Sequence, residues 1–307
     1  MMKSVRYYFS FVIIAIVLTS AVLSNECGRS AESIFVKDNI TPWCIVPFDA
    51  KNRTPQERAE MLQRLSFKTF AYDWRDVHIS TFDEEVAELR KSGIQMTAFW
   101  WVGGLPKRAE DIYESEKGRL QMDFFKRNNL KLEVWVTLTE PDEEVNSKQE
   151  KYELAASYVD ILAQELGKIG CRMSLYNHGG WGGEPVNMVE VIKRVKSKNT
   201  GLVYNFHHGH KHLDDMPEAF EMMVPYLTCV NLNGMNRDGP KILPLGEGEV
   251  DLWILKIIRD SGYKGPIGIL GHVTDEDVEI VLKRNLDGLR SLLVKLGDKA
   301  AAKTYED

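Results

Sequence analysis

The sequence is poor in cysteine and has no excess of basic charge. It contains 4 cysteines, and no two of them form a CxxC pair, so a zinc ribbon is excluded. Cys44, Cys171 and Cys229 each fall in a predicted strand, where a free buried cysteine behaves as a small apolar residue. The net charge of −6 argues against nucleic acid or an anionic membrane surface as the main partner. With 44% hydrophobic residues, the chain is long enough for a large globular core.

The N-terminus departs from this globular pattern. Lys3 and Arg6 precede an uncharged apolar run from about Tyr7 to Leu23, which ends in small residues. This layout is typical of a secretory signal peptide, and we expect one over residues 1–24, followed by a polar leader over residues 25–41. The protein is then exported, either periplasmic or secreted. The alternative is an uncleaved segment that anchors the chain to a membrane, because the apolar run approaches spanning length.

The rest of the chain alternates short β-rich runs with amphipathic helical patterns. The β-rich runs predict strands at residues 43–48, 67–72, 94–101, 130–138, 171–176, 201–206, 227–232 and 267–270. The first helix opens with a capping box of Thr54 and Glu57, and Pro55 occupies its first position. Strands that are each followed by a helix predict an α/β fold, a single (β/α)8 TIM barrel over residues 42–296. Residues 297–307 are expected to form a frayed tail. An open doubly wound sheet would require a glycine-rich loop after the first strand, which is missing.

Chemistry in a barrel takes place at the carboxyl ends of its strands. The predicted strand ends carry Asp49, Asp73, Trp74, Trp100, Trp101, Glu140, Asn177, His178, Asn205, His207, His208, His210, Asn231, Asn233 and His272. Of the 7 histidines in the chain, His178, His207, His208 and His210 follow two neighbouring strands. Imidazole transfers protons near neutral pH and also binds metals. We predict that His178 and His208 act as catalytic acid and base.

Indoles and amides at these ends suit a polyhydroxylated ring, which presents apolar CH faces edged by hydroxyls. The predicted substrate-binding residues are Trp100, Trp101, Glu140, Asn177, Asn205, Asn231, Asn233 and His272. Because Trp100 and Trp101 point to opposite faces of a strand, at most one of them lines the mouth and the other belongs to the core. The asparagines have a second interpretation as loop caps. The acidic segment 245–251 would repel a phosphate, which favours an unphosphorylated sugar.

The segments Asn177-His-Gly-Gly, Asn205-Phe-His-His, Leu245-Gly-Glu-Gly-Glu-Val-Asp and Gly265-Pro-Ile-Gly-Ile resemble the sugar phosphate isomerase/epimerase family. These proteins are xylose isomerase-like TIM barrels related to the endonuclease IV fold, and the resemblance runs from Trp43 to about Leu296. It implies a divalent metal held after strands five to eight, with two glutamates that move a proton through an enediolate. The corresponding positions here are Tyr176, Asn205, Asn231 and Leu270, so the anionic and imidazole ligands are replaced.

This departure leaves two options open for the chemistry. His207, His208 and His210 hold a divalent metal (zinc, manganese or magnesium), or the histidines perform acid–base chemistry themselves. We therefore predict an exported, sugar isomerase/epimerase-like enzyme whose partner is a small-molecule carbohydrate. It does not bind nucleic acid, and it meets a membrane only if the N-terminal segment stays uncleaved. The alternatives are a non-catalytic carbohydrate-binding barrel, or a lyase or hydrolase that acts on a modified glycoside.

Overall fold

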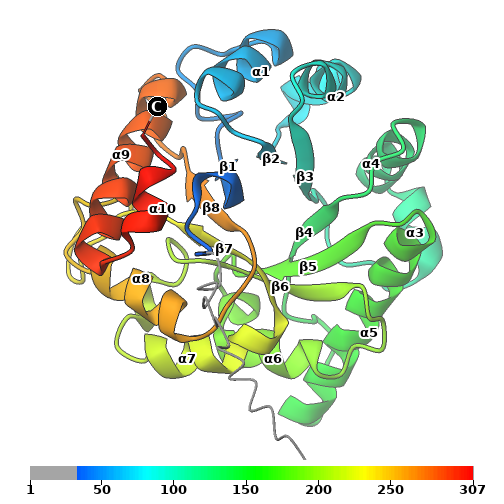
Figure 1. The fold of residues 1–307 in the computed structure, drawn as a ribbon. Coiled ribbons are helices and arrows are strands. Elements are labelled where there is room, and N and C mark those ends of the chain that lie inside the picture. The colour runs from blue at the N-terminus through cyan, green and yellow to red at the C-terminus, as the bar shows by residue number, and fades with distance from the viewer. Residues whose placement is uncertain (1–32, 307) are drawn as a thin grey trace, which may run out of the picture. The chain divides into compact units, whose positions relative to one another are not determined.

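The computed structural model describes residues 33–306, and the predicted signal peptide lies outside the described residues. The described chain is a parallel barrel whose strands are surrounded by helices (Figure 1). The strands are β1 (Ile40–Trp43), β2 (Thr69–Tyr72), β3 (Gln95–Trp100), β4 (Glu133–Thr137), β5 (Arg172–Tyr176), β6 (Thr200–Asn205), β7 (Leu227–Leu232) and β8 (Ile267–Leu270). The helices are α1 (Pro55–Arg64), α2 (Phe82–Lys91), α3 (Ala109–Glu114), α4 (Glu116–Arg127), α5 (Lys148–Lys168), α6 (Pro185–Ile192), α7 (Met216–Met223), α8 (Asp251–Asp260), α9 (Val278–Leu296) and α10 (Lys299–Lys303).

The predicted TIM barrel is confirmed. The strands form an 8-stranded parallel sheet in the order β1-β8-β7-β6-β5-β4-β3-β2. The two strands at the ends of this order meet through the hydroxyls of Thr41 on β1 and Thr69 on β2, whose oxygens lie 2.6 Å apart. The sheet thus curves into a nearly closed barrel, and all its strands end at the same face. Within residues 33–306, no helix has the length and apolarity needed to cross a membrane.

The capping box predicted at the first helix is present. The Thr54 side chain accepts a hydrogen bond from the Glu57 backbone at 3.3 Å, and the Glu57 carboxylate accepts one from the Thr54 backbone at 2.8 Å. Pro55 occupies the first helical position, where a missing N–H costs nothing. Local sequence chemistry therefore sets where α1 begins.

The first strand begins and ends earlier than predicted. It spans Ile40–Trp43, so its first two residues fall inside the predicted polar leader (residues 25–41), and the run that follows it forms a loop. The strand stops because Cys44 adopts a φ of 56°, a left-handed conformation that extended pairing cannot continue. Cys44 is consequently a partly exposed loop residue, whereas Cys171 and Cys229 are buried free thiols. This shift moves residues 44–48 to the carboxyl end of the barrel.

The C-terminal tail packs against the barrel instead of fraying. Residues 299–303 form α10, and the Ala301 and Ala302 side chains are buried. The Tyr305 hydroxyl donates a hydrogen bond to the Phe35 carbonyl at 2.7 Å, and the Thr304 hydroxyl accepts one from the Lys37 backbone at 2.9 Å. The tail therefore closes the chain onto the segment that precedes β1.

A buried ion pair joins α1 to α2. The Arg58 guanidinium contacts the Glu85 carboxylate at 2.9 Å, and their side chains are only 4% and 0% exposed. We expect Arg58→Met to lower the free energy of unfolding by about 3–5 kcal/mol, because it leaves a buried carboxylate without a partner. Urea unfolding followed by circular dichroism measures the change.

The matched control is Arg64→Met on the same helix. Arg64 pairs with Glu279, but its side chain is 54% exposed, so the substitution should change stability little. Adding Glu85→Leu to Arg58→Met should recover most of the loss. If Arg58→Met and Arg64→Met lowered the free energy of unfolding equally, the buried ion pair would contribute no more to stability than the exposed one.

Candidate functional site

A cavity of about 240 Å³ lies at the carboxyl ends of the strands. It is lined by Trp43, Cys44, Phe48, Asp73, Arg75, Trp100, Tyr176, His178, Asn205, His207, His208 and His272. These residues come from the ends of β1, β2, β3, β5, β6 and β8, or from the loops that follow them. Active sites of TIM barrels occupy this face, so the cavity is the candidate site.

Aromatic rings form the floor of the cavity. The ring centroids of Trp43 and Trp100 lie 6.0 Å apart, and those of Trp100 and Tyr176 lie 5.1 Å apart in an edge-on arrangement. The Tyr176 hydroxyl accepts hydrogen bonds from the Trp43 indole at 3.0 Å and from the Asn205 amide at 2.5 Å. Burial raises the pKa of this phenol well above its usual value, so the hydroxyl keeps its proton. With both acceptor positions in use, that proton remains available to a ligand oxygen.

An asparagine clamp fixes the ends of β5 and β6. The Asn177 side chain accepts a hydrogen bond from the Asn205 backbone N–H at 2.7 Å and donates one to the Asn205 carbonyl at 3.0 Å. The Asn205 side chain in turn accepts a hydrogen bond from the His207 backbone at 3.1 Å. These contacts position His178 and the His207–His208 pair, which directly follow the clamped residues.

Four imidazoles form one wall. The ring centroids of His178 and His208 lie 4.5 Å apart, those of His207 and His208 lie 4.4 Å apart, and those of His207 and His272 lie 5.6 Å apart. The His272 ring also packs on Phe48, with 3.8 Å between the centroids. The structure therefore brings together histidines that the sequence places after β5, β6 and β8.

Burial keeps these imidazoles neutral. Desolvation, followed by the charges of neighbouring histidines and Lys241, lowers the pKa of His208 to about 3. Desolvation and the Lys241 charge lower the pKa of His207 to about 4. The pKa values of His178 and His272 are also lowered, first by desolvation and then by Arg75. At neutral pH the wall offers uncharged nitrogen acceptors and N–H donors.

His207 carries an unpaired ring nitrogen in the imidazole wall. Its buried Nδ1 has no hydrogen-bond partner among residues 33–306. The backbone of Lys241 partly opposes the lowering of the His207 pKa by burial. The Lys241 carbonyl is held in place by the Asn233 amide, which donates a hydrogen bond to it at 2.6 Å.

Asp73 is the carboxylate that lines the cavity. One of its oxygens accepts a hydrogen bond from the Val46 backbone at 3.3 Å, and the other has no partner among the described residues. Burial raises the pKa of Asp73 to about 6, although the Val46 N–H and the Arg75 charge oppose the shift. A carboxyl group that titrates near pH 6 suits proton transfer. Burial and the Asp73 charge also raise the pKa of the Cys44 thiol well above its usual value, so Cys44 stays protonated.

Several predicted site residues lie outside the cavity. Trp101 is buried on the opposite face of β3 from Trp100, as the alternation along a strand requires. Glu140 forms a surface ion pair with Lys151 at 2.6 Å. The His210 ring bonds the Asn236 carbonyl at 2.7 Å instead of joining His207 and His208 in the cavity lining.

The predicted binding asparagines divide between the cavity and its supports. Only Asn205 lines the cavity, while the fully buried Asn177 serves as the clamp. Asn233 holds the loop after β7 through the Gly234 and Lys241 carbonyls. Asn231 packs against Gly268, where any added Cβ would lie 1.7 Å from the Asn231 Oδ1. The interpretation of these amides as loop and strand supports therefore holds for Asn177, Asn231 and Asn233.

The residues present do not fit a metal site. No group of three histidine, cysteine, aspartate or glutamate side chains within residues 33–306 is placed to hold a metal ion. The predicted His207, His208 and His210 set fails because His210 bonds elsewhere. At the positions that the resemblance associates with metal ligands, Tyr176 and Asn205 bond each other, while Asn231 and Leu270 are buried.

Four of the residues that line the cavity are not among those expected from the sequence, namely Trp43, Cys44, Phe48 and Arg75. Trp43, Cys44 and Phe48 were placed inside the first predicted strand, and the earlier end of β1 brings them to the site. Asp73 was recognised at a strand end, and Arg75 is two residues further on. An arginine at a suitable spacing after the aspartate is the sequence signal that distinguishes a paired Asp49 from the unpaired Asp73. Arg53 lies four residues beyond Asp49 and pairs with it at 2.8 Å.

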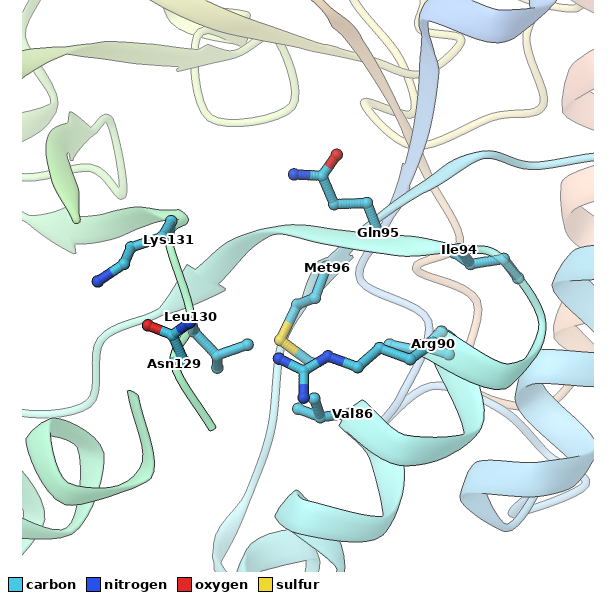
Figure 2. A pocket seen from close by; sticks show the side chains of 9 residues that line it. Val86, Arg90, Ile94, Gln95, Met96, Asn129, Leu130 and Lys131 are labelled. Atoms are coloured by element: carbon cyan, nitrogen blue, oxygen red, sulfur yellow. The ribbon is translucent and has the colours of Figure 1, made fainter. Parts of the chain in front are cut away.

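A second cavity of about 230 Å³ lies where β3 begins, at the opposite end of the barrel from the first (Figure 2). Figure 2 shows Val86, Arg90, Met96 and Leu130 gathered on one side of β3, with Gln95 pointing to the other. Arg90 donates to the Asn128 carbonyl at 2.5 Å, and Lys131 donates to the Ile169 carbonyl. Both cations serve the local backbone, so this cavity lacks the converging acid–base groups of the first.

Solved structures with the same fold include several proteins that act on sugars. The 3-keto-D-glucoside 4-epimerase of E. coli aligns over 83% of this chain and 99% of its own, with a TM-score of 0.59 and 15% identity. A D-tagatose 3-epimerase-like protein aligns over 85% and 99%, with a TM-score of 0.63 and 16% identity. The IOLI protein with a binding zinc atom aligns over 83% and 98%, with a TM-score of 0.63 and 12% identity. At these identities the likeness establishes the fold alone.

Sequence comparison identifies the family. No curated protein sequence matches the chain. A family model described as the xylose isomerase-like TIM barrel matches residues 59–292, which span most of the barrel from α1 to α9. The match agrees with the strand order, the closed sheet and the position of the cavity, and the chain belongs to the xylose isomerase-like TIM barrel family.

Proposed function

We propose that the protein is a carbohydrate epimerase or isomerase that moves a proton with its own side chains. The observation that carries the proposal is the cavity itself, where an aromatic floor meets neutral imidazoles and a buried carboxyl group. Indole and phenol rings pack on the CH faces of a sugar, and imidazoles bond its hydroxyls. The names of the 3-keto-D-glucoside 4-epimerase and the D-tagatose 3-epimerase-like protein support a sugar as the substrate class.

Two groups approach the substrate from opposite sides. Asp73 follows β2, and His207 and His208 follow β6, which is four places from β2 in the eight-strand order. Strands separated in this way face each other across a barrel. Inversion of a carbon centre needs a proton removed from one face and returned to the other, and this arrangement supplies a group for each.

Before the reaction Asp73 carries a proton and the imidazole on the opposite side is neutral. After it the imidazole holds the proton taken from carbon and Asp73 is ionised, and the two groups return to the starting state by proton exchange with solvent. A neutral imidazole, His208 or its neighbour His178, takes the proton from the carbon next to a carbonyl. The bonding electrons move into the enediolate, whose oxygen receives a hydrogen bond from the Tyr176 hydroxyl. The protonated Asp73 then delivers its proton to the other face of the same carbon. No step is routed through a metal.

We further propose that the chain is exported. The support is the basic, apolar and small-residue layout of residues 1–24, which lie outside the described residues.

Trp100 tests carbohydrate binding. Removing its indole by Trp100→Ala should weaken sugar affinity about tenfold, because the ring loses its stacking surface. Isothermal titration with neutral hexoses and methyl glycosides measures the affinity. The control is Trp253→Ala on α8. It removes a half-buried indole that packs under the Arg237 guanidinium. If the protein bound no carbohydrate at all, the proposed function would be wrong.

His178 and His208 test the imidazole side of the reaction. We expect His178→Ala and His208→Ala each to lower kcat by about 10²–10⁴, the usual contribution of a general acid or base. Exchange of the substrate's carbon-bound hydrogen with solvent deuterium, followed by NMR, measures proton transfer directly. His212→Ala is the control, because that ring contacts Glu184 outside the cavity. Unchanged turnover with reduced affinity would instead indicate a non-catalytic carbohydrate-binding barrel.

Asp73 gives the pH dependence. The active form carries one proton on the Asp73–histidine pair, so kcat/KM should fall as the pH rises through about 6, where Asp73 ionises. Asp73→Asn should abolish turnover at every pH, because the amide has no acidic proton to deliver. The folded pKa lies above the unfolded value, so ionised Asp73 destabilises the fold at neutral pH. The Asp73→Asn variant should therefore unfold at no lower temperature than the wild type at pH 7.5. An active Asp73→Asn variant would contradict the assignment.

A further inference from the structure

Two cations near the cavity, Arg75 and Lys241, form no ion pair within the part of the chain that the structure describes. Arg75 lines the cavity and is exposed, and its guanidinium donates one hydrogen bond, to the Trp74 carbonyl at 2.7 Å. Lys241 is also exposed, and its charge acts on both His207 and His208. Arg90, Arg119 and Arg172 also form no salt bridge among the described residues, so Arg75 is distinguished by its position in the cavity lining.

Asp73 lines the same cavity as Arg75 but forms no ion pair with it. Asp73 is 2% exposed and bonds the Val46 backbone, and its oxygens make no hydrogen bond to Arg75. Arg75 also faces His178 and His272, whose pKa values its charge helps to lower. Phe48 lies beneath the guanidinium, with 5.8 Å from its carbon to the ring centroid, and so holds it at the rim. The guanidinium is thus positioned over the cavity with donors to spare.

We propose that the ligand is a sugar acid and that Arg75 binds its carboxylate. The proposal rests on the proposed function, because it names the class of carbohydrate that the same cavity takes. The planar guanidinium fork matches a carboxylate, and the imidazole N–H groups of His178 and His272 add donors beside it. Lys241, whose charge acts on His207 and His208, adds attraction for an anion.

A carboxylate fits this site better than a phosphate does. Many barrels bind phosphate through backbone N–H groups in the loop after strand seven. In this protein the Asp251 carboxylate already accepts hydrogen bonds from those groups, Gly246 at 2.7 Å, Gly248 at 3.0 Å and Met235 at 2.9 Å. The loop is closed around an internal anion. A single guanidinium at the rim then remains for the ligand, which suits one carboxylate.

The test compares ligands that differ only in charge. Isothermal titration of the full chain uses D-glucuronate and D-galacturonate, their neutral amides, and glucose 6-phosphate. We expect at least one uronate to bind about tenfold or more tightly than its amide, as a charged hydrogen bond contributes. Arg75→Gln should remove that preference and leave the affinity for the amide within about twofold. Arg75→Lys should restore only part of it, because the fork is lost.

The control is Arg237→Gln, which removes an exposed arginine that pairs with Asp214 outside the cavity and should keep the preference intact. Equal affinity for uronate and amide, or tighter binding of the phosphate, would overturn the sugar-acid proposal. Neutral sugars would then still bind and turn over, so the proposed function would stand. Failure of every carbohydrate to bind would overturn both.

Discussion

Aromatic packing inside the barrel is the constraint on which the site depends. Trp43 and Trp135 meet edge to face with 4.7 Å between their ring centroids, and Trp135 stacks on Tyr176 at 5.9 Å. These rings form a buried cluster with small or aliphatic side chains from the other strands, including Ala71, Ala98, Val203, Cys229 and Leu270. The cluster fills the barrel centre, so a ligand cannot enter deeply and meets the aromatic floor. The polar groups of the site are consequently confined to the rim above it.

The same packing sets the protonation of the rim. Rings below and beside the histidines exclude water, and desolvation is the first cause of every lowered imidazole pKa. It is also the first cause of the raised pKa of Asp73. Desolvation disfavours the charged form of each group, and therefore moves acids and imidazoles in opposite directions. The result is a set of neutral donors and acceptors with one carboxyl group that titrates near neutrality.

The side chains at the positions that the family resemblance assigns to metal ligands make structural contacts. Tyr176 and Asn205 bond each other, Leu270 belongs to the interior cluster, and Asn231 packs on Gly268. Such replacements remove the anionic ligands that a hard divalent cation prefers. The groups that can transfer a proton now come from other places, β2 for Asp73 and the loops after β5 and β6 for the histidines. The proposed function accordingly assigns proton transfer to side chains of the chain itself.

The sequence by itself determined the fold, because strand and helix periodicities are local properties. The strands at residues 227–232 and 267–270 were predicted at the residues where β7 and β8 lie, and Thr54, Pro55 and Glu57 marked the start of α1. It also indicated that His178, Asn205, His207, His208 and His272 lie at one face. Trp100 and Trp101 were correctly assigned to opposite faces, since alternation along a strand is fixed by the backbone.

Only the tertiary structure decided which of these residues share a cavity. The early end of β1 depends on the left-handed Cys44, and it brought Trp43 and Phe48 to the site. The sequence suggests that Asn177 and Asn233 bind a ligand. In the structure their side chains instead bond the backbone of other segments, that of Asn205 for Asn177 and that of Lys241 for Asn233. Likewise, Asp49 and Asp73 look alike as strand-end acids, yet Arg53 pairs with the first while the second is buried at the cavity. Apart from the local Arg53–Asp49 pair, these hydrogen-bond partners and the desolvation arise from the packing of segments that are separate in the chain.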